Sequence, residues 1–299
     1  MGYGFGQVRA TAATDIGLRR AVNEDSVLEA GTVFAVADGM GGHEAGEVAS
    51  ALCVRTLGAS PLFQLEDFRD FEVLEPEPPR DIARFRAVVE RELRLDPEIP
   101  DDAIEAVRRV RSVLWQADQH IQHAVEGRAG TTVTGVWLLP VDGRMLWVVF
   151  NTGDSRTYRL VAPQPGGRAG EGEGGPRIEQ LTVDHSEVQY LVSIGQLTSA
   201  QALVHPRRNV ITRALGTCQV WEPDVWVLPA RHGDRLMLCS DGLTNELSPA
   251  HMARVLASVP HPKEAADVLL QAALRTGGRD NVTVIVADAV TPEEYASGV

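Results

Sequence analysis

The sequence predicts an α+β protein in which antiparallel strands form the core and separate helices cover them. Apolar runs at 131–139 and 145–150 are joined by a turn at 140–144, and so short a link makes antiparallel neighbours. A second observation is that apolar residues recur at three- and four-residue steps across 101–126, as in a helix. A third is that aspartates stand where several apolar runs begin or end. We therefore expect packed sheets with a polar site at one edge.

The composition is that of an acidic globular protein. The chain has 299 residues, of which 44% are hydrophobic, which is enough for one large domain. A net charge of −13 and a pI near 5.1 argue against a nucleic-acid or anionic-membrane surface, because such a surface needs a basic patch. Three cysteines without CxxC spacing indicate neither a disulfide framework nor a zinc site, and favour a cytoplasmic location. With no signal peptide and no apolar run of membrane-spanning length, we expect a soluble protein.

The first half of the chain predicts two strands and two helices. The strands are expected over 8–13 and over 33–37, the helices over 44–57 and 101–126. In the first helix the apolar face is expected to consist of Val48, Leu52 and Leu57. Between the helices, 59–101 is rich in proline and charge, which predicts a surface insertion that either docks a partner or only covers the surface.

The second half predicts further strands, a loop, a flap and one more helix. A glycine-rich stretch at 163–176 predicts a flexible loop. Two short helices, one over 187–195 and one capped by Thr198, form an expected flap at 187–212. The last helix is expected to begin at Pro262, to end at 277–278 and to pack through Val268, Leu269, Ala272 and Ala273. The remaining strands are expected at 157–161, 225–228, 235–240 and 282–286.

Four aspartates lie at ends of the apolar runs, each beside glycine or asparagine: Asp38, Asp154, Asp241 and Asp280. One such residue would be explained by the frequency of aspartate in turns, but four predict a shared site. If 282–286 runs antiparallel to the other strands, all four reach one edge of the fold. Clustered carboxylates repel one another unless a cation neutralises them, and donors that are all oxygen favour Mn²⁺ or Mg²⁺.

The loop before the second strand adds a cation and two more acids. Arg20 precedes Glu24 and Asp25, a grouping that suits a site handling phosphate beside metal, with a surface ion-pair cluster as the alternative. Two ions bridged by one carboxylate lie about 3.5–4 Å apart, a geometry that clamps a phosphoryl group and activates water. Arg20 is then the candidate for the cationic fork at the phosphoryl group. The residues predict metal-assisted phosphate hydrolysis.

Seven short motifs carry a resemblance to a known family. They occur in order between residues 14 and 287: Arg20-x-x-Asn23-Glu24-Asp25, Asp38-Gly39-Met40-Gly41-Gly42-His43, Gly130-Thr131-Thr132, Gly153-Asp154-Ser155-Arg156, Leu181-Thr182-x-Asp184-His185-Ser186, Ser240-Asp241-Gly242-Leu243 and Asp280-Asn281-Val282-Thr283. This ordered set resembles the protein phosphatase 2C family, the metal-dependent Ser/Thr protein phosphatases, and is most similar to its bacterial branch.

The resemblance implies a fold and a domain plan. The fold would be a four-layer α-β-β-α sandwich of two mainly antiparallel sheets flanked by helix pairs. A single phosphatase domain would cover 1–290, with 59–101 as the insertion, 187–212 as the flap and 291–299 as a C-terminal tail. Substrates would be phosphorylated Ser/Thr proteins, and the implied partner is a Ser/Thr kinase of eukaryotic type.

The resemblance also implies metal ligands. Asp38 would bridge two Mn²⁺ or Mg²⁺ ions, the Gly39 carbonyl would bind one of them, and Asp241 and Asp280 would complete the other. With Asp241, Asp154 would hold the weaker third ion seen in bacterial relatives.

Further roles follow from the same resemblance. Glu24 would act through water bound to the ions, with Asp25 supporting it and Asn281 standing behind Asp280. Arg20 would grip the substrate phosphate, and water bridging the ions would attack phosphorus as hydroxide.

Several assignments stay open on the sequence alone. Met40 stands where some relatives place a histidine that protonates the leaving alkoxide, so in this chain the acid would be water or another group. His43 is one candidate for that acid, and the alternative for His43 is a helix-start or packing role. Asp184 and His185 are expected to brace the entry to the flap, with substrate contact as the alternative. The basic stretch at 205–209 is a candidate phosphopeptide contact. Thr131 and Thr132 are expected to bond backbone near the ions rather than to act as nucleophiles.

Two other functions fit the same motifs. The first is a non-catalytic regulatory module, which usually loses one or more ligands, whereas this sequence retains all of them. The second is an enzyme acting on a phosphorylated anti-sigma-factor antagonist, a branch that tends to carry sensory domains.

Overall fold

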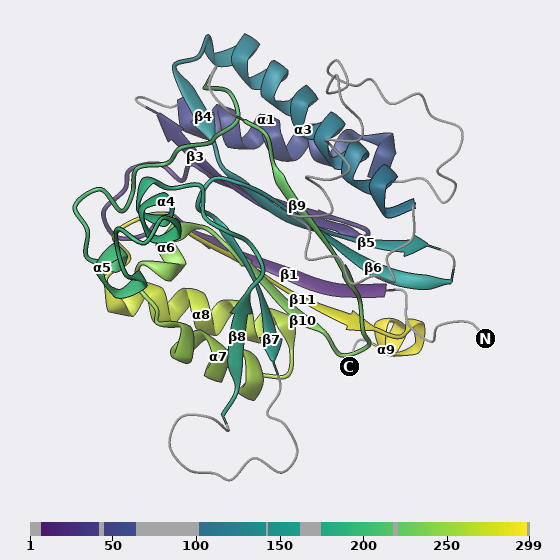
Figure 1. The fold of residues 1–299 in the computed structure, drawn as a ribbon. Helices are drawn as coiled ribbons and strands as arrows, with labels where there is room; N and C mark the ends of the chain where they lie inside the picture. Colours follow the sequence, from purple (N-terminus) through teal and green to yellow (C-terminus); the bar gives the residue numbers. More distant parts are fainter. Residues whose placement is uncertain are drawn as a thin grey trace.

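The computed structural model describes residues 7–41, 45–63, 102–141, 143–161, 175–217 and 221–297. In these ranges two antiparallel sheets lie face to face, and helices cover the outer side of each (Figure 1). The expected four-layer α-β-β-α sandwich is therefore confirmed. Most of the insertion expected at 59–101, the loop at 163–176 up to residue 174, His43 and Cys218 lie outside the described residues.

One sheet carries both ends of the described chain. Its strand order is β1-β11-β10-β7-β8. Strand β11 pairs antiparallel with both β1 and β10. The strands are β1 (Gln7–Asp15), β7 (Arg156–Val161), β8 (Arg177–Gln180), β10 (Arg235–Cys239) and β11 (Val282–Val290).

The other sheet has the order β2-β3-β5-β6-β9, with β4 attached to the far end of β3. The predicted hairpin is present: β5 and β6 pair from Val141 opposite Arg144 to Val133 opposite Thr152. The strands are β2 (Asp25–Ala30), β3 (Val33–Gly41), β4 (Ala129–Thr131), β5 (Val133–Val141), β6 (Arg144–Thr152) and β9 (Asp224–Pro229).

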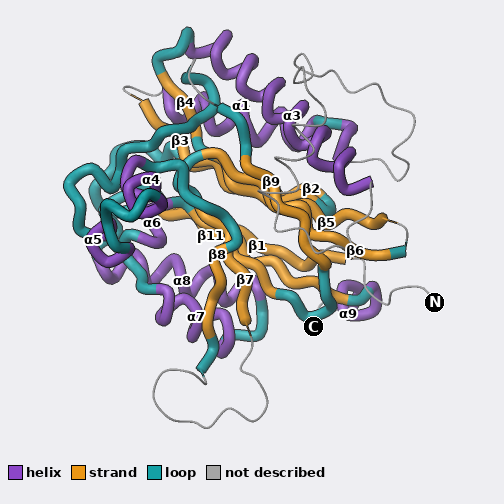
Figure 2. Tube along the Cα trace, in the orientation of Figure 1, coloured by secondary structure: helices purple, strands orange, loops and turns teal. Residues whose placement is uncertain are grey.

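Long helices form the two outer layers, which Figure 2 separates from the strands by colour. α1 (Ala45–Ala59) and α3 (Asp102–Val125) cover the β3 sheet, and α7 (Pro249–Ser258) and α8 (Pro262–Thr276) cover the β11 sheet. Within α3, Val110, Leu114, Ala117 and Ile121 repeat at three- and four-residue steps and are fully buried, as the periodicity predicts. Among the described residues, no helix combines the length and the apolar character needed to cross a membrane.

Short helices complete the chain. They are η1 (Pro61–Phe63), α4 (Glu187–Ser193), α5 (Ser199–Leu203), α6 (Asp241–Thr244) and α9 (Pro292–Ser297). The two flap helices begin where predicted, and Thr198 forms a capping box with Gln201 at the start of α5. Residues 291–299, expected to be a tail, contain α9.

Two of the expected helix faces are wrong in part. Val48 is 43% exposed, whereas Leu57 is buried and Leu52 packs against the core as expected. Ala49 and Cys53, at the i and i+4 positions before Leu57, complete the buried face of α1. In α8 Val268 is 38% exposed, whereas Leu269 is fully buried.

A separate apolar layer holds the two sheets together. Val36 of β3, Leu238 of β10 and Ile285 of β11 are fully buried in this layer. Close packing of this kind fixes the distance between the sheets, and both sheets bring acids to one end.

Candidate metal centre

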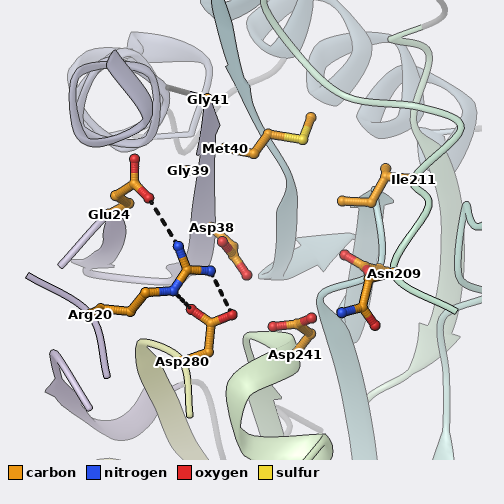
Figure 3. Close-up of a pocket in the computed structure, with 11 residues that line it drawn as sticks. Arg20, Glu24, Asp38, Gly39, Met40, Gly41, Asn209, Ile211, Asp241 and Asp280 are labelled. Carbon is orange, nitrogen blue, oxygen red and sulfur yellow. Dashed lines mark hydrogen bonds and ion pairs between the residues drawn. The ribbon is translucent and has the colours of Figure 1, made fainter. Parts of the chain in front are cut away.

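A cavity of about 220 Å³ lies at one end of the sandwich. Figure 3 shows its lining drawn from both sheets and from the flap. The lining residues are Arg20, Glu24, Asp38, Gly39, Met40, Gly41, Asp154, Asn209, Ile211, Asp241 and Asp280. The structure thus brings the four predicted aspartates together with Arg20 and Glu24.

Strand ends deliver the aspartates. Asp38 lies near the end of β3, directly opposite Asp25 of β2. Asp154 follows β6 on the link that crosses to β7 in the other sheet. Asp241 begins α6 just after β10, and Asp280 stands just before β11. Because β10 and β11 run antiparallel, with Cys239 opposite Val284, the last two aspartates reach the same end.

Hydrogen bonds hold the backbone around Asp38. The amide of Asp38 donates to the hydroxyl of Thr132 at 3.2 Å, and the hydroxyl of Thr131 donates to the Asp38 carbonyl at 2.9 Å. The two threonines therefore bond backbone beside the cavity, as expected.

Glycines let the loop that carries Glu24 come close to β3 and α1. A Cβ atom on Gly39 would lie 2.2 Å from the Gly46 carbonyl oxygen, and one on Gly46 would lie 2.4 Å from the Glu24 carboxylate. Both distances are too short for any other residue. The Glu24 carboxylate therefore sits against the first turn of α1.

Arg20 pairs with Asp280. The Nε and one terminal nitrogen of its guanidinium each lie 2.8 Å from a different oxygen of Asp280, and its other terminal nitrogen lies 3.8 Å from Glu24 (Figure 3). This is the fork geometry in which arginine binds a carboxylate or a phosphate.

Asn281 connects the Arg20 loop to the Asp280 turn. Its amide nitrogen donates to the carbonyls of Ile16 and Val22, and its side-chain oxygen accepts from the amide of Glu24, each at 2.9 Å. Asn281 thus holds both ends of the loop that carries Arg20.

Asp25 is a buried carboxylate with one oxygen unsatisfied. The hydroxyl of Ser240 donates to its Oδ2 at 2.8 Å, whereas Oδ1 has no partner among the described residues. Burial, with the charges of Asp241 and Asp280, raises the pKa of Asp25 to about 6. An orphaned acceptor of this kind indicates a missing cation or water.

The carboxylates that line the cavity also have raised pKa values. Burial first, and then the neighbouring carboxylates, raise the pKa of Asp38 well above its usual range, that of Asp154 to about 8 and that of Asp241 to about 6. A divalent cation would reverse these shifts because it stabilises the ionised form of every carboxylate around it.

The donor set fits a hard cation. The acids of the cavity offer oxygen only, which is the ligand chemistry of Mn²⁺ and Mg²⁺. As the side chains stand, no three His, Cys, Asp or Glu residues in the described part of the chain converge closely enough to enclose an ion. Arg20 instead contacts both carboxylate oxygens of Asp280.

His185 and Asp184 brace the entry to the flap. His185 Nδ1 accepts from the amide of Gly153 at 3.2 Å, and Nε2 lies 3.0 Å from Asp224, so the ring is the tautomer that donates from Nε2. The guanidinium of Arg156 forks onto Asp184, with the closest contact at 2.6 Å. Both contacts flank the turn of Asp154.

Sequence reasoning missed Ile211 and Asn245. Ile211 reaches the cavity from the flap, as does Asn209, which belongs to the basic stretch at 205–209 named above as a candidate phosphopeptide contact. Asn245 donates to the Asp241 carboxylate at 3.0 Å, and its position four residues after Asp241 on a helix would have indicated this contact.

Comparisons with known proteins agree with this site. Residues 19–276 match the family described as Protein phosphatase 2C. The chain is 38% identical to the serine/threonine protein phosphatase PstP of Mycobacterium tuberculosis over 283 residues, which are 95% of this chain and 45% of that protein. It is 32% identical to the serine/threonine phosphatase stp of Listeria innocua over 286 residues, 94% of this chain and 96% of that protein. The chain thus spans about half the length of the mycobacterial relatives.

Solved structures share the fold. Stp1 of Staphylococcus aureus matches with a TM-score of 0.69 at 30% identity, over 96% of this chain and 97% of that one. The catalytic domain of PstP, solved in complex with two manganese ions, matches with a TM-score of 0.65 at 34% identity, over 95% of this chain and 99% of that one. With its ordered motifs, its sandwich fold and its acidic cavity in agreement, the chain belongs to the protein phosphatase 2C family.

Proposed function

We propose that this protein is a metal-dependent phosphatase that hydrolyses phosphoserine and phosphothreonine in proteins. The observation that carries the proposal is the single cavity in which Arg20 lies among the carboxylates of Glu24, Asp38, Asp154, Asp241 and Asp280. A phosphoryl group needs a cationic fork and divalent ions together, and this cavity has groups for both. The family named above supports the same reaction.

The ligands are those that the family resemblance implies, and all of them line the cavity. Asp38 would bridge two ions, the Gly39 carbonyl would bind one, and Asp241 and Asp280 would complete the other. A third ion would lie between Asp154 and Asp241, and Glu24 would contribute through water. When bound, Mn²⁺ or Mg²⁺ would lower the pKa of a nucleophilic water and would offset charge on the phosphoryl group.

The residues of the chain position the substrate around this centre. The Arg20 guanidinium, released from Asp280, would take two phosphate oxygens in the same fork that it now offers to the carboxylate. Asn209 and Ile211 of the flap lie over the opposite side of the cavity and would limit how the phosphorylated side chain enters (Figure 3). Asp25 would support Glu24, and Asn281 would hold the loop that carries Arg20 and Glu24 through its side-chain hydrogen bonds.

The proton for the leaving alkoxide would come from solvent. Met40 has no proton to give, and the described lining of the cavity contains no histidine. The cavity opens to solvent at Arg20, whose side chain is 46% exposed. Water at this opening would supply the proton.

The proposed partner is a Ser/Thr kinase whose phosphorylated products this enzyme would reverse, in the cytoplasm. The bacterial phosphatases named above support this partner. The location rests on the cysteines, of which Cys53 and Cys239 are buried and free. A regulatory module without catalysis is less well supported, because the complete set of expected ligands lines the cavity.

Hydrolysis of an aryl phosphate and of a phosphothreonine peptide, with and without Mn²⁺, tests the proposal. Asp38→Asn and Asp241→Asn should each lower Mn²⁺-dependent turnover by at least about 100-fold, because each removes a charged ligand from the reacting centre. Asp267→Asn is the matched control, since Asp267 is an exposed acid on α8 whose one side-chain partner in the described part of the chain is Lys263. Near-normal turnover in folded Asp38→Asn protein would overturn the proposal.

A further inference from the structure

Two turns of the chain deliver two of the proposed ligands and touch each other. The turn from β10 into α6 carries Asp241, and the turn from α8 into β11 carries Asp280. A Cβ atom on Gly242 would lie 1.9 Å from the Asn281 carbonyl oxygen, so only glycine allows this approach. The spacing of Asp241 and Asp280 therefore depends on how these two turns are held.

An ion pair between Glu246 and Arg279 joins the same two turns. Oε1 of Glu246 accepts from the Arg279 backbone amide at 3.1 Å and from its Nε at 2.8 Å, and Oε2 accepts from a terminal nitrogen at 3.1 Å. Arg279 stands directly before Asp280, and Glu246 follows the helical turn that Asp241 begins. The contact is thus made beside both ligands.

The burial of this pair is unequal. The Glu246 side chain is only 1% exposed, whereas that of Arg279 is 65% exposed. A Cβ atom on Gly277 would lie 2.9 Å from one Glu246 carboxylate oxygen and 3.0 Å from the other, so the chain leaves room there for the carboxylate. Hydrogen bonding to Arg279 keeps the pKa of Glu246 below its usual range, so Glu246 stays ionised at neutral pH.

Asn245 extends the contact to the Asp241 carboxylate. Its amide nitrogen donates to Oδ2 of Asp241 at 3.0 Å, and its backbone carbonyl accepts from Arg279 at 3.2 Å. A continuous path of hydrogen bonds thus runs from Arg279 through Asn245 to Asp241. Neither Glu246 nor Arg279 lines the cavity, so both would act through the ligands.

We propose that Glu246, Arg279 and Asn245 form a clamp that sets the spacing of Asp241 and Asp280 and so determines how tightly the site binds a divalent cation. All three are positioning residues. The inference rests on the proposed function, because it takes Asp241 and Asp280 as ligands. Residues that orient ligands from behind typically contribute about 10- to 100-fold in metal affinity.

Substitution of Arg279 tests this clamp, because two explanations predict opposite changes in the affinity for a cation. Removing a positive charge next to a cation site tightens cation binding if only charge matters. Removing a part of the clamp loosens it, because Asp241 and Asp280 are then free to drift apart. Arg275 is the matched control, since it is an exposed arginine in the last turn of α8 with no side-chain partner among the described residues.

The experiment is titration of chelator-treated protein with Mn²⁺ by calorimetry, with electron paramagnetic resonance of the bound ion as a second readout. Arg279→Ala should weaken Mn²⁺ binding by about 10-fold and broaden the spectrum, whereas Arg275→Ala should bind as tightly as the unaltered protein or more tightly. Asn245→Ala, which changes no charge, should also weaken binding. Arg279→Lys should restore part of the affinity, because one donor remains.

The outcomes separate this inference from the proposed function. One outcome is that Asp280→Asn loses Mn²⁺ binding while Arg279→Ala and Asn245→Ala bind Mn²⁺ normally. That outcome rejects the proposed clamp and keeps Asp280 as a metal ligand. If Asp280→Asn itself binds Mn²⁺ normally, the ligand assignment is wrong. A merely structural ion pair would lower the melting temperature of Arg279→Ala without changing the Mn²⁺ affinity of the folded protein, and that result also overturns the clamp. If Arg279→Ala does not fold, the Mn²⁺ affinities of Arg279→Lys and Asn245→Ala test the clamp in its place.

Discussion

The guanidinium of Arg20 forks onto the carboxylate of Asp280, with two contacts of 2.8 Å to two different oxygens. The same Asp280 is a proposed metal ligand and the same Arg20 a proposed phosphate grip. Each of these roles would weaken the pair, because a cation bound to Asp280 would repel the Arg20 guanidinium.

Removal of Arg20 should consequently have two opposite effects. Arg20→Ala should bind Mn²⁺ more tightly, because Asp280 is freed and a positive charge is lost, and should raise the KM for an aryl phosphate by about 10-fold or more, because a charged hydrogen bond to phosphate is lost. Calorimetry and steady-state kinetics measure the two. Arg19→Ala is the control, since Arg19 is exposed and does not line the cavity. A KM that stays unchanged in Arg20→Ala would remove Arg20 from the substrate site.

The stability of the metal-free protein should fall as pH rises. Folding raises the pKa of Asp25 and Asp241 to about 6 and that of Asp154 to about 8, from an ordinary value of 3.8. The folded state therefore binds more protons than the unfolded state between about pH 4 and pH 8, and the free energy of unfolding decreases across that window.

Urea unfolding at pH 5 and pH 8, with chelator and then with Mn²⁺, measures this effect. With chelator the protein should be more stable at pH 5, and Mn²⁺ should remove the difference because it holds the carboxylates ionised. Asp154→Asn should flatten the pH dependence in chelator. A metal-free protein that is equally stable at both pH values would contradict the raised pKa values.

Gly242 should tolerate no side chain. Gly242→Ala places a Cβ atom 1.9 Å from the Asn281 carbonyl oxygen, which forces the Asp241 and Asp280 turns apart and should destabilise the fold by about 1–3 kcal/mol. Gly175→Ala is the matched control, because a Cβ there meets no atom within 4 Å. Thermal unfolding compares the two variants, and equal melting temperatures would mean that the turns do not press on each other.

His185 should matter for stability and for the turn of Asp154. His185→Ala removes the acceptor for the Gly153 amide and the donor to Oδ2 of Asp224, at a cost of about 1–3 kcal/mol. His123→Ala, at an exposed position near the end of α3, is the control. Calorimetric unfolding tests this, and a His185→Ala protein as stable as the control would show that the bonds around Gly153 are made elsewhere.

The strands and the acids of the site were predictable because their signals are local. Asp38, Asp154, Asp241 and Asp280 each stand beside an apolar run, so the sequence alone placed them at strand ends. β2 was missed because it is an edge strand of mixed polarity, of which no residue is fully buried. α7 was missed although Ser248 and Pro249 make a helix start, with Ser248 accepting from the amide of His251.

Other features arise only when distant segments meet. Tertiary packing decides which face of α1 meets the sheet, and that face includes Ala49 and Cys53 rather than Val48. The pairing of Glu246 with Arg279 joins residues on two separate turns, and neither residue stands out in its own segment. Asn209 reaches the cavity because the flap folds back over it.

The proposed ligands come from both sheets, with Asp38 on one and Asp241 and Asp280 on the other. The thickness of the apolar layer between the sheets therefore sets the distance between the proposed ligands on the two sheets. Substitution of Ile285, Val36 or Leu238 by a larger or smaller side chain would change the gap that a cation has to bridge, although these side chains lie in the interior apolar layer. An ion bound by ligands from both sheets would in turn crosslink the two sheets, and removal of the ion would let them shift relative to each other.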